Sequence, residues 1–477
     1  MVHNGLGIIK SRLGQVLKTV GLTLDLTKEE KIKIFWLTFS FFCVIGAYTV
    51  LKELKDILFS EIVGSTSLYK VKMLSMFVLL PATLLYAKLV DYMSRFSLLV
   101  FYSMVYGLGG IVIAYFLADP VIGLPNNTPD ASRIFGWVIY LFYEGVVPFV
   151  VSVFWAFANS VTAPETAKKG YTLMIAGSKL GGMLMAGLGW LMFMPSSILG
   201  RLGWSSVTMI QILLVGSSLL LAISPLIIYV LLRKASKDSM DGYKAVHQYE
   251  QEQEAKGESE TGVLSGLVMM MKHPYILGIF GMMFFYELVN VVLGIQRTVL
   301  LQAGAKDSVE FVGEMFRQRF FMHFVGLIIS FFGTRILVKR LGERVCLALI
   351  PLITGALLIY FMLAYNQSAI MFVFMALGMI NYAFASPLRE SLYIPTVKDI
   401  RFKSKAWIES FGQRFAKACG SSAIGFIQSF AAVGTAAYFT LFAGFFSITI
   451  ALWTLVALAL GKKYASVIKN GEIIGAE

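Results

Sequence analysis

The chain has 477 residues, of which 57% are hydrophobic and only 14% charged, and its mean hydropathy is +0.74. Soluble domains are typically about 45–50% apolar and about 25% charged, so the composition excludes a soluble globular protein, which must cover its surface with polar groups. The excess of 41 Lys and Arg over 28 Asp and Glu, a net charge of +13, favours contact with anionic lipid or an anionic ligand.

Apolar stretches of about 20 residues, the length of a membrane-spanning helix, recur along the chain. In chain order the predicted spans are residues 32–51, 68–90, 97–118, 134–161, 171–194, 206–232, 275–302, 318–338, 345–365, 369–388, 406–432 and 435–461. They are too long for membrane β-strands, which take about 10 alternating residues. The sequence therefore predicts an all-α membrane protein with twelve transmembrane helices.

A charged, weakly apolar stretch separates the first six spans from the last six, and it cannot order itself by burying apolar surface. The predicted organisation is a cytoplasmic segment 1–31, a six-helix half 32–232, a polar linker 233–274, a second six-helix half 275–461 and a tail 462–477. Lys and Arg are concentrated in the segments on the side of the N-terminus, which predicts that both termini are cytoplasmic.

The two predicted halves echo each other in sequence. Residues 87–95 (AKLVDYMSR), after the second span, and residues 335–344 (RILVKRLGER), after the eighth, are short charged turns. Both resemble the loop motif of the major facilitator superfamily. Two halves related by parallel repetition place a substrate site near the membrane midplane between them, so we expect a pseudo-symmetric, major-facilitator-like bundle.

Charged side chains at span depth cost about 2.5–3.5 kcal/mol on insertion scales, and each is therefore a hypothesis of function. The first cluster consists of Lys52, Lys55 and Asp56, where the first predicted span ends. Lys52 and Lys55 share a helix face, and their ammonium groups repel unless an anion lies between them. The alternative is an exposed helix end with snorkelling lysines.

Two carboxylates lie inside predicted spans. Glu144 is in the fourth span, and Glu287 is in the seventh with Asn290 one turn later on the same face. They would limit repulsion among cations and could contact polar groups of a ligand, whereas the alternative for Glu144 is a carboxylate that water reaches. Arg297, near the end of the seventh span, could be a simple interface anchor.

Two lysines occupy matching positions in the two halves. Lys179 in the fifth span and Lys417 in the eleventh each lie among small residues, and Arg414 shares a helix face with Lys417. Small residues let helices approach closely, so one interpretation is a packing face with a snorkelling lysine. The other is that these cations line one central cavity and bind a polyanion, because phosphate oxygens accept charge-assisted hydrogen bonds from Lys and Arg.

The sequence lacks the motifs that would indicate ATP hydrolysis, enzyme catalysis or metal binding. A Gly-x-x-x-x-Gly-Lys-Ser/Thr phosphate loop does not occur, which disfavours an ATP-driven pump. A nucleophile–base pair is not readable and the histidines are isolated, so we predict no catalytic residue, metal or cofactor. The three cysteines lie in apolar segments, which excludes a disulfide framework. The basic residues are spread between apolar runs, so nucleic-acid binding is not expected.

Four stretches resemble the nucleotide transporter family of bacteria and plastids, which includes the ATP/ADP translocases of obligate intracellular bacteria. They are residues 48–56 (YTVLKELKD), 152–159 (SVFWAFAN), 390–395 (ESLYIP) and 402–417 (FKSKAWIESFGQRFAK). Two lysines and two glutamates are held essential in that family. The resemblance maps them onto Lys55, Glu144, Glu287 and Lys417.

The resemblance implies exchange of ATP for ADP plus phosphate by alternating access, in the inner membrane of an obligate intracellular bacterium. The expected partners are nucleoside di- and triphosphates, inorganic phosphate and the lipid bilayer, and we expect a monomer that is not an enzyme. Proton-coupled import, or a broader range of nucleotides or dinucleotides, is the alternative within transport. A membrane phospholipid transferase is the alternative from another class, but it should carry a nucleophile or metal-binding acids that the sequence does not show.

Overall fold

The computed structural model describes residues 26–162, 164–234, 265–332, 342–381, 385–397 and 404–475. Most of the predicted N-terminal segment 1–31, most of the predicted linker 233–274 and most of the second loop motif at 335–344 lie outside the described residues. At the edge of the linker, helix α11 (Ser265–Lys272) directly precedes the next long helix.

The first half of the described chain is helical throughout its predicted spans. Its elements are α2 (Lys28–Ile62), η1 (Ser65–Ser67), α3 (Leu68–Tyr92), α4 (Arg95–Phe116), α5 (Ile134–Glu144), η2 (Val147–Val151), α6 (Ser152–Ser160), α7 (Pro164–Phe193), η3 (Gly200–Leu202) and α8 (Ser206–Lys234). A capping box starts α2, where the Thr27 hydroxyl accepts from the Glu30 backbone N–H and the Glu30 carboxylate accepts from that of Thr27.

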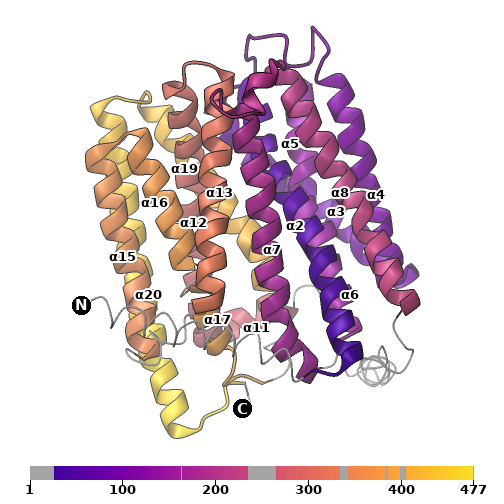
Figure 1. Cartoon of the computed structure of the whole chain (residues 1–477). Helices are drawn as coiled ribbons and strands as arrows, with labels where there is room; N and C mark the ends of the chain where they lie inside the picture. The colour runs from indigo at the N-terminus through magenta and orange to yellow at the C-terminus, as the bar shows by residue number, and fades with distance from the viewer. Residues whose placement is uncertain are drawn as a thin grey trace, which may run out of the picture.

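The second half repeats this pattern. Its elements are α12 (Pro274–Gly304), α13 (Ser308–Phe332), α15 (Glu343–Ala364), α16 (Gln367–Ile380), α17 (Ser386–Leu392), α18 (Lys405–Trp407), η6 (Ile408–Gly412), α19 (Gln413–Phe430) and α20 (Ala436–Asn470). Figure 1 shows the helices of both halves running roughly alongside one another in a single bundle.

Nine of the described helices are long and apolar enough to cross a membrane. The other three predicted spans fall on α13, α16 and α19, which are shorter or carry charged side chains. Within the described residues, each of the twelve predicted spans coincides largely with helix, and the all-α membrane fold is confirmed.

The first predicted span ends too early. It was expected to stop at residue 51, but α2 continues without a break to Ile62. Many of the added residues are buried, including the charged side chains of Glu53 and Lys55. The helix continues because its polar side chains are satisfied by neighbouring helices, so the lysines do not lie at an exposed helix end.

Short π-helical segments occur within the described spans. The segment η2 joins α5 to α6 and includes Pro148, which has no backbone N–H to donate to a regular helix. The segment η6 joins α18 to α19 in the second half. Such segments shift the helical register and often occur beside functional sites, and both of these lie next to the cavity described below.

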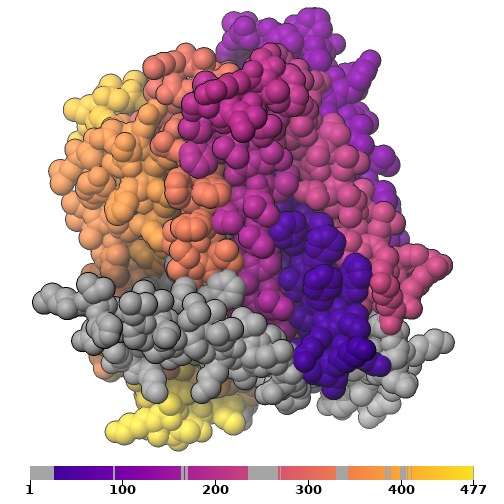
Figure 2. Space-filling model, viewed as in Figure 1, coloured from indigo at the N-terminus to yellow at the C-terminus, as the bar shows by residue number. Residues whose placement is uncertain are grey.

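Glycines on α7 bring three helices into close contact. A Cβ atom on Gly181 would lie 2.3 Å from the Phe42 carbonyl oxygen of α2, and one on Gly182 would lie 2.4 Å from the His323 ring of α13. Helix α7 therefore packs on α2 with one face and on α13 of the second half with another. Figure 2 shows α7 against α13 on the surface where the halves meet.

The two ends of the bundle differ. Figure 1 shows α2 beginning and α20 ending on one side, which we call the terminal side, while the connection between α4 and α5 lies on the other, the loop side. On the loop side Gln302 of α12 donates to the Ser60 carbonyl at 3.1 Å and to the Glu61 carboxylate at 3.2 Å. Ser308 of α13 also donates to Glu61. These contacts join the two halves at the loop side.

Candidate functional site

A cavity of about 560 Å³ lies between the two halves near the middle of the bundle. That volume is within the range of small-molecule sites, roughly 300–1,000 Å³. Its basic lining residues are Lys52, Lys55, Lys72, Arg297, Arg319, Arg414 and Lys417, its acidic ones are Asp56, Glu144, Glu287 and Glu409, and its aromatic ones include Tyr48, Tyr140, Tyr143, Tyr286 and Phe374. Basic side chains outnumber acidic ones, so the cavity suits an anion with an aromatic part.

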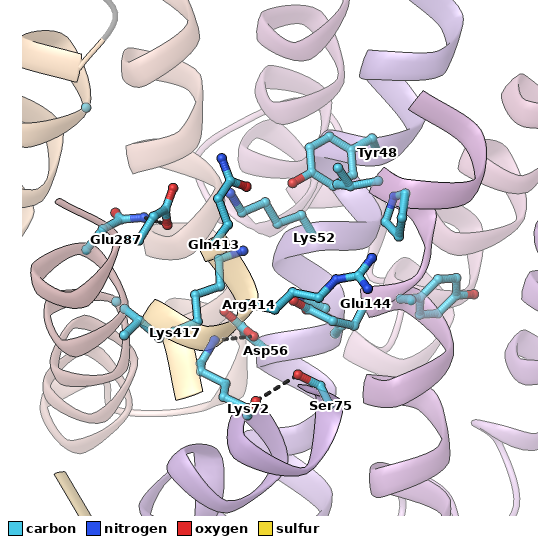
Figure 3. Close-up of a pocket in the computed structure, with 18 of the residues that line it drawn as sticks. Tyr48, Lys52, Asp56, Lys72, Ser75, Glu144, Glu287, Gln413, Arg414 and Lys417 are labelled. Carbon is cyan, nitrogen blue, oxygen red and sulfur yellow. Dashed lines mark hydrogen bonds and ion pairs between the residues drawn. The ribbon is translucent and has the colours of Figure 1, made fainter. Parts of the chain in front are cut away.

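Helix α2 supplies a stripe of the cavity wall. Tyr48, Lys52 and Asp56 are spaced four residues apart, which puts them on one face of the helix, and all three line the cavity. The Lys52 ammonium lies 5.8 Å from the centre of the Tyr48 ring. Figure 3 shows Lys52 reaching into the same space as Lys417 of the second half.

Lys55 and Glu144 form an ion pair between α2 and α5. Their side chains are only 10% and 17% exposed, and the Lys55 ammonium lies 4.6 Å from the centre of the Tyr140 ring. Two residues that sequence reasoning selected separately therefore meet inside the first half. An opposite charge offsets the cost of burying each one.

Lys72 is a cavity residue that sequence reasoning missed. Its ammonium lies 3.5 Å from the Asp56 carboxylate and donates to the Tyr140 hydroxyl at 2.9 Å. Lys72 stands inside the predicted span 68–90, so the cost of a charge at span depth was a signal that could have found it. The first half therefore contains two ion pairs of its own at the cavity, Lys55 with Glu144 and Lys72 with Asp56.

The second half brings Glu287, Asn290, Arg414 and Lys417 to the same cavity. The Asn290 amide nitrogen lies 3.5 Å from the Glu287 carboxylate, as the one-turn spacing predicted. Arg414 donates to the Thr83 hydroxyl of α3 at 2.8 Å, across the boundary between the halves. Lys417 forms no ion pair with any carboxylate of the described residues, so its charge is available to a ligand.

Lys179 does not line this cavity, contrary to the expectation that it faces the same space as Lys417. Its side chain lies against Gly326 of α13, with the Cδ atom 3.5 Å from the position a Cβ there would take. The reason is the close packing of α7 on α13, which places this face of α7 in the seam between two helices.

A third cluster was not foreseen. Glu53, next to Lys52 on α2, accepts hydrogen bonds from Arg297 at 2.8 Å and from Arg319 at 2.6 Å. All three residues are buried, so Arg297 is not the interface anchor that sequence reasoning considered. The charged segment that contains Glu53 was recognised, but its pairing depends on helices more than two hundred residues away in the chain.

The described residues contain no group of three His, Cys, Asp or Glu side chains that could hold a metal ion. The side chains that line the cavity offer hydrogen bonding, charge and aromatic contact. Cationic groups from both halves can bind phosphate oxygens, and the tyrosines offer ring faces or hydroxyl groups to the rest of a ligand.

A family model described as TLC ATP/ADP transporter matches residues 134–464. The chain belongs to this family of ATP/ADP transporters. The match confirms the resemblance that the motifs indicated, and it covers part of the first half and nearly all of the second.

Relatives from Rickettsia extend over nearly the whole chain, and a chloroplast relative matches part of it. ADP,ATP carrier protein 1 of Rickettsia conorii is 23% identical over 497 residues, covering 93% of this chain and 96% of the relative. ADP,ATP carrier protein 3 of Rickettsia bellii is 24% identical with the same coverage. The chloroplastic ADP,ATP carrier protein 2 of Arabidopsis thaliana is 31% identical over 172 residues, covering 31% of this chain and 27% of the relative.

Solved transporters share the fold. A D-xylose–proton symporter has a TM-score of 0.60 at 14% identity, covering 90% of this chain and 96% of its own. The nucleoside transporter NupG has a TM-score of 0.54 at 14% identity, covering 91% and 99%. These likenesses confirm the major-facilitator-like arrangement of the helices.

Proposed function

We propose that this protein exchanges ATP for ADP, together with phosphate, across a membrane by alternating access. The observation that carries the proposal is the central cavity, which both halves line with basic side chains. Membership of a family of ATP/ADP transporters supports the same cargo. The cargo leaves chemically unchanged, so the protein acts as a carrier and not as an enzyme.

The phosphate groups bind between Lys52 of the first half and Arg414 and Lys417 of the second. A cargo held from both sides can draw the halves together, which alternating access requires of a substrate at the boundary. The ion pairs of Lys55 with Glu144 and of Lys72 with Asp56 limit repulsion in the empty site. The Glu287 carboxylate then accepts hydrogen bonds from ribose hydroxyls or an exocyclic amine. The Asn290 side-chain amide can accept from such groups or donate to a hydroxyl oxygen.

The terminal side faces the cytoplasm in this proposal, because Lys and Arg are concentrated there. The loop side is then the outer side, and the contacts of Gln302 and Ser308 with Glu61 keep it closed. The protein resides in the inner membrane of a bacterium, as the Rickettsia relatives support.

The test is uptake of labelled ATP into liposomes that contain the purified protein and are loaded with ADP. Uptake should require internal ADP and should persist when a protonophore collapses the proton gradient. Unlabelled ATP and ADP should compete well, AMP poorly and adenosine hardly at all, because each phosphate removed takes negative charge with it. Equal competition by adenosine would contradict a cationic phosphate site, and uptake that needs a proton gradient would favour proton-coupled import over exchange.

A further inference from the structure

Glu53 joins the two halves through a buried network of charges. Its carboxylate accepts one hydrogen bond from the Nη2 group of Arg297 on α12 and another from the Nε group of Arg319 on α13. Glu53 is 1% exposed, Arg297 2% and Arg319 6%. The Nη1 group of Arg297 donates to Gln318 at 3.0 Å, which holds the guanidinium in place.

The network belongs to a stripe on α2 that contacts the second half. Thr49, four residues before Glu53, lies 3.0 Å from the His323 ring of α13. Ser60, seven residues after Glu53, accepts from Gln302 through its carbonyl. Because these positions share a helix face, one side of α2 meets the second half from mid-bundle to the loop side. Within this set of contacts, which we call the loop-side closure, Glu53 is the residue that pairs with arginines of the second half.

The same two arginines also line the substrate cavity. The Arg297 guanidinium lies 4.7 Å from the centre of the Phe374 ring, which is also a lining residue. Its Nε atom is buried and has no hydrogen-bond partner among the described residues. Arg297 therefore keeps an unused Nε donor, although its Nη1 group donates to Gln318 and its Nη2 group to Glu53.

We propose that Arg297 and Arg319 couple substrate binding to opening of the loop side, by exchanging the Glu53 carboxylate for a phosphate group of the cargo. Both anions match the donor geometry of a guanidinium. A phosphate in the cavity can therefore replace Glu53 as the partner of a buried cation, whereas a neutral cargo would leave that cation unpaired, at high cost. Release of Glu53 removes the charged contact that joins α2 to α12 and α13. The inference rests on the proposed function, because it takes the cargo to be a nucleotide.

A cysteine reporter at Ser60 tests this coupling. Ser60 is fully buried at the loop-side closure, so a water-soluble maleimide should label Ser60→Cys only when the halves part. The three native cysteines are replaced by alanine, and labelling rates are measured on the purified full-length protein in detergent, which makes the result independent of membrane orientation. ADP, ATP and adenosine are the probes added.

Three results are expected. ADP and ATP should raise the labelling rate of the reporter protein at least about fivefold, the lower end of typical coupling between sites, and adenosine should leave it unchanged. Glu53→Gln should raise the rate by a similar factor without nucleotide, and ADP should then add little. Glu61→Gln is the matched control, because Glu61 contacts Gln302 and Ser308 of the second half but pairs with no arginine of the described residues. A glutamine amide can keep both hydrogen bonds, so the labelling rate of this variant should stay near that of the parent.

The proposal is overturned if Glu53→Gln labels no faster than Glu61→Gln, or if adenosine raises the rate as much as ADP does. Should Glu53→Gln fail to fold with two arginines unpaired, the double variant Glu53→Gln/Arg319→Gln removes one stranded charge and must show the same fast labelling. If these variants label fast but the parent protein exchanges no nucleotide in liposomes, the role of Glu53 in the loop-side closure is confirmed and the proposed cargo is rejected.

Discussion

Two neighbouring residues of α2, Glu53 and Lys55, form buried ion pairs, and the pairs differ in which half supplies the partner of opposite charge. Glu144 pairs with Lys55 inside the first half, whereas Glu53 pairs with Arg297 and Arg319 of the second half. In alternating access each half moves largely as a rigid body. A pair within one half therefore persists through the cycle, while a pair between halves must separate. Charge on one face of α2 lines the cavity, and charge on another face contacts the second half, where we propose that it holds the loop side closed.

The basic residues of the cavity divide in a similar way. Lys55 and Lys72 already have carboxylate partners in the first half, whereas Lys417 has none among the described residues. A lysine that is paired with a carboxylate contributes to the shape of the site, but its partner offsets part of its positive electrostatic potential. An unpaired one offers its full charge to the cargo. The comparison predicts that removing these lysines will have different consequences.

The largest effect is expected from Glu144→Gln, which leaves the buried Lys55 without its partner. Removing one member of a buried ion pair typically lowers stability by about 3–5 kcal/mol, so the melting temperature in detergent should fall markedly and transport should be lost. The double variant Lys55→Gln/Glu144→Gln should regain most of the melting temperature but no transport. If the single and double variants melt alike, the pair does not stabilise the first half.

Lys417→Gln should act on binding and not on stability. Loss of a hydrogen bond to a charged group costs about 1.5–3 kcal/mol, so nucleotide affinity should fall more than about tenfold. The melting temperature without nucleotide should stay close to wild type, because Lys417 has no ion pair to lose in the described part of the chain. Competition binding and thermal unfolding on the same preparation check both parts. Wild-type affinity in a folded variant would remove Lys417 from the site.

Lys72→Gln should weaken binding less than Lys417→Gln does. Its charge is partly balanced by Asp56, 3.5 Å away, and its removal should cost about 1 kcal/mol, roughly a fivefold loss of affinity. The measurement is the competition assay used for Lys417→Gln. If Lys72→Gln loses as much nucleotide affinity as Lys417→Gln, an ion pair within the first half does not reduce the contribution of a lysine to binding.

Lys179→Gln should have the smallest effect on binding. The side chain lies in the seam between α7 and α13 and does not line the cavity. Affinity should therefore change by no more than about twofold, within the ±0.5 kcal/mol usual for substitutions away from a site. It also serves as the matched control for Lys417→Gln, since the two lysines occupy corresponding positions of the halves. A tenfold loss would place Lys179 in the substrate path in another conformation.

Much of the fold could be predicted because crossing a membrane is a local property of sequence. Each span needs about 20 apolar residues wherever its neighbours lie, so all twelve spans were readable one at a time. The candidate site was partly readable for a related reason. A charge within a span is costly whatever its partner, which pointed to Glu144, Glu287 and Lys417, and to Lys55 at the end of the first predicted span.

The sequence by itself thus determined the number of spans, the division into two halves and most of the costly charges. Only the tertiary structure decided how those charges pair, because partners such as Glu53 and Arg319 lie on different helices and meet through packing that no local pattern encodes. It also decided that α2 continues to Ile62, since polar side chains satisfied by neighbours no longer end a buried helix. Lys179 and Lys417 look alike in sequence, and close packing of glycines on α7 excludes the first from the cavity that the second enters.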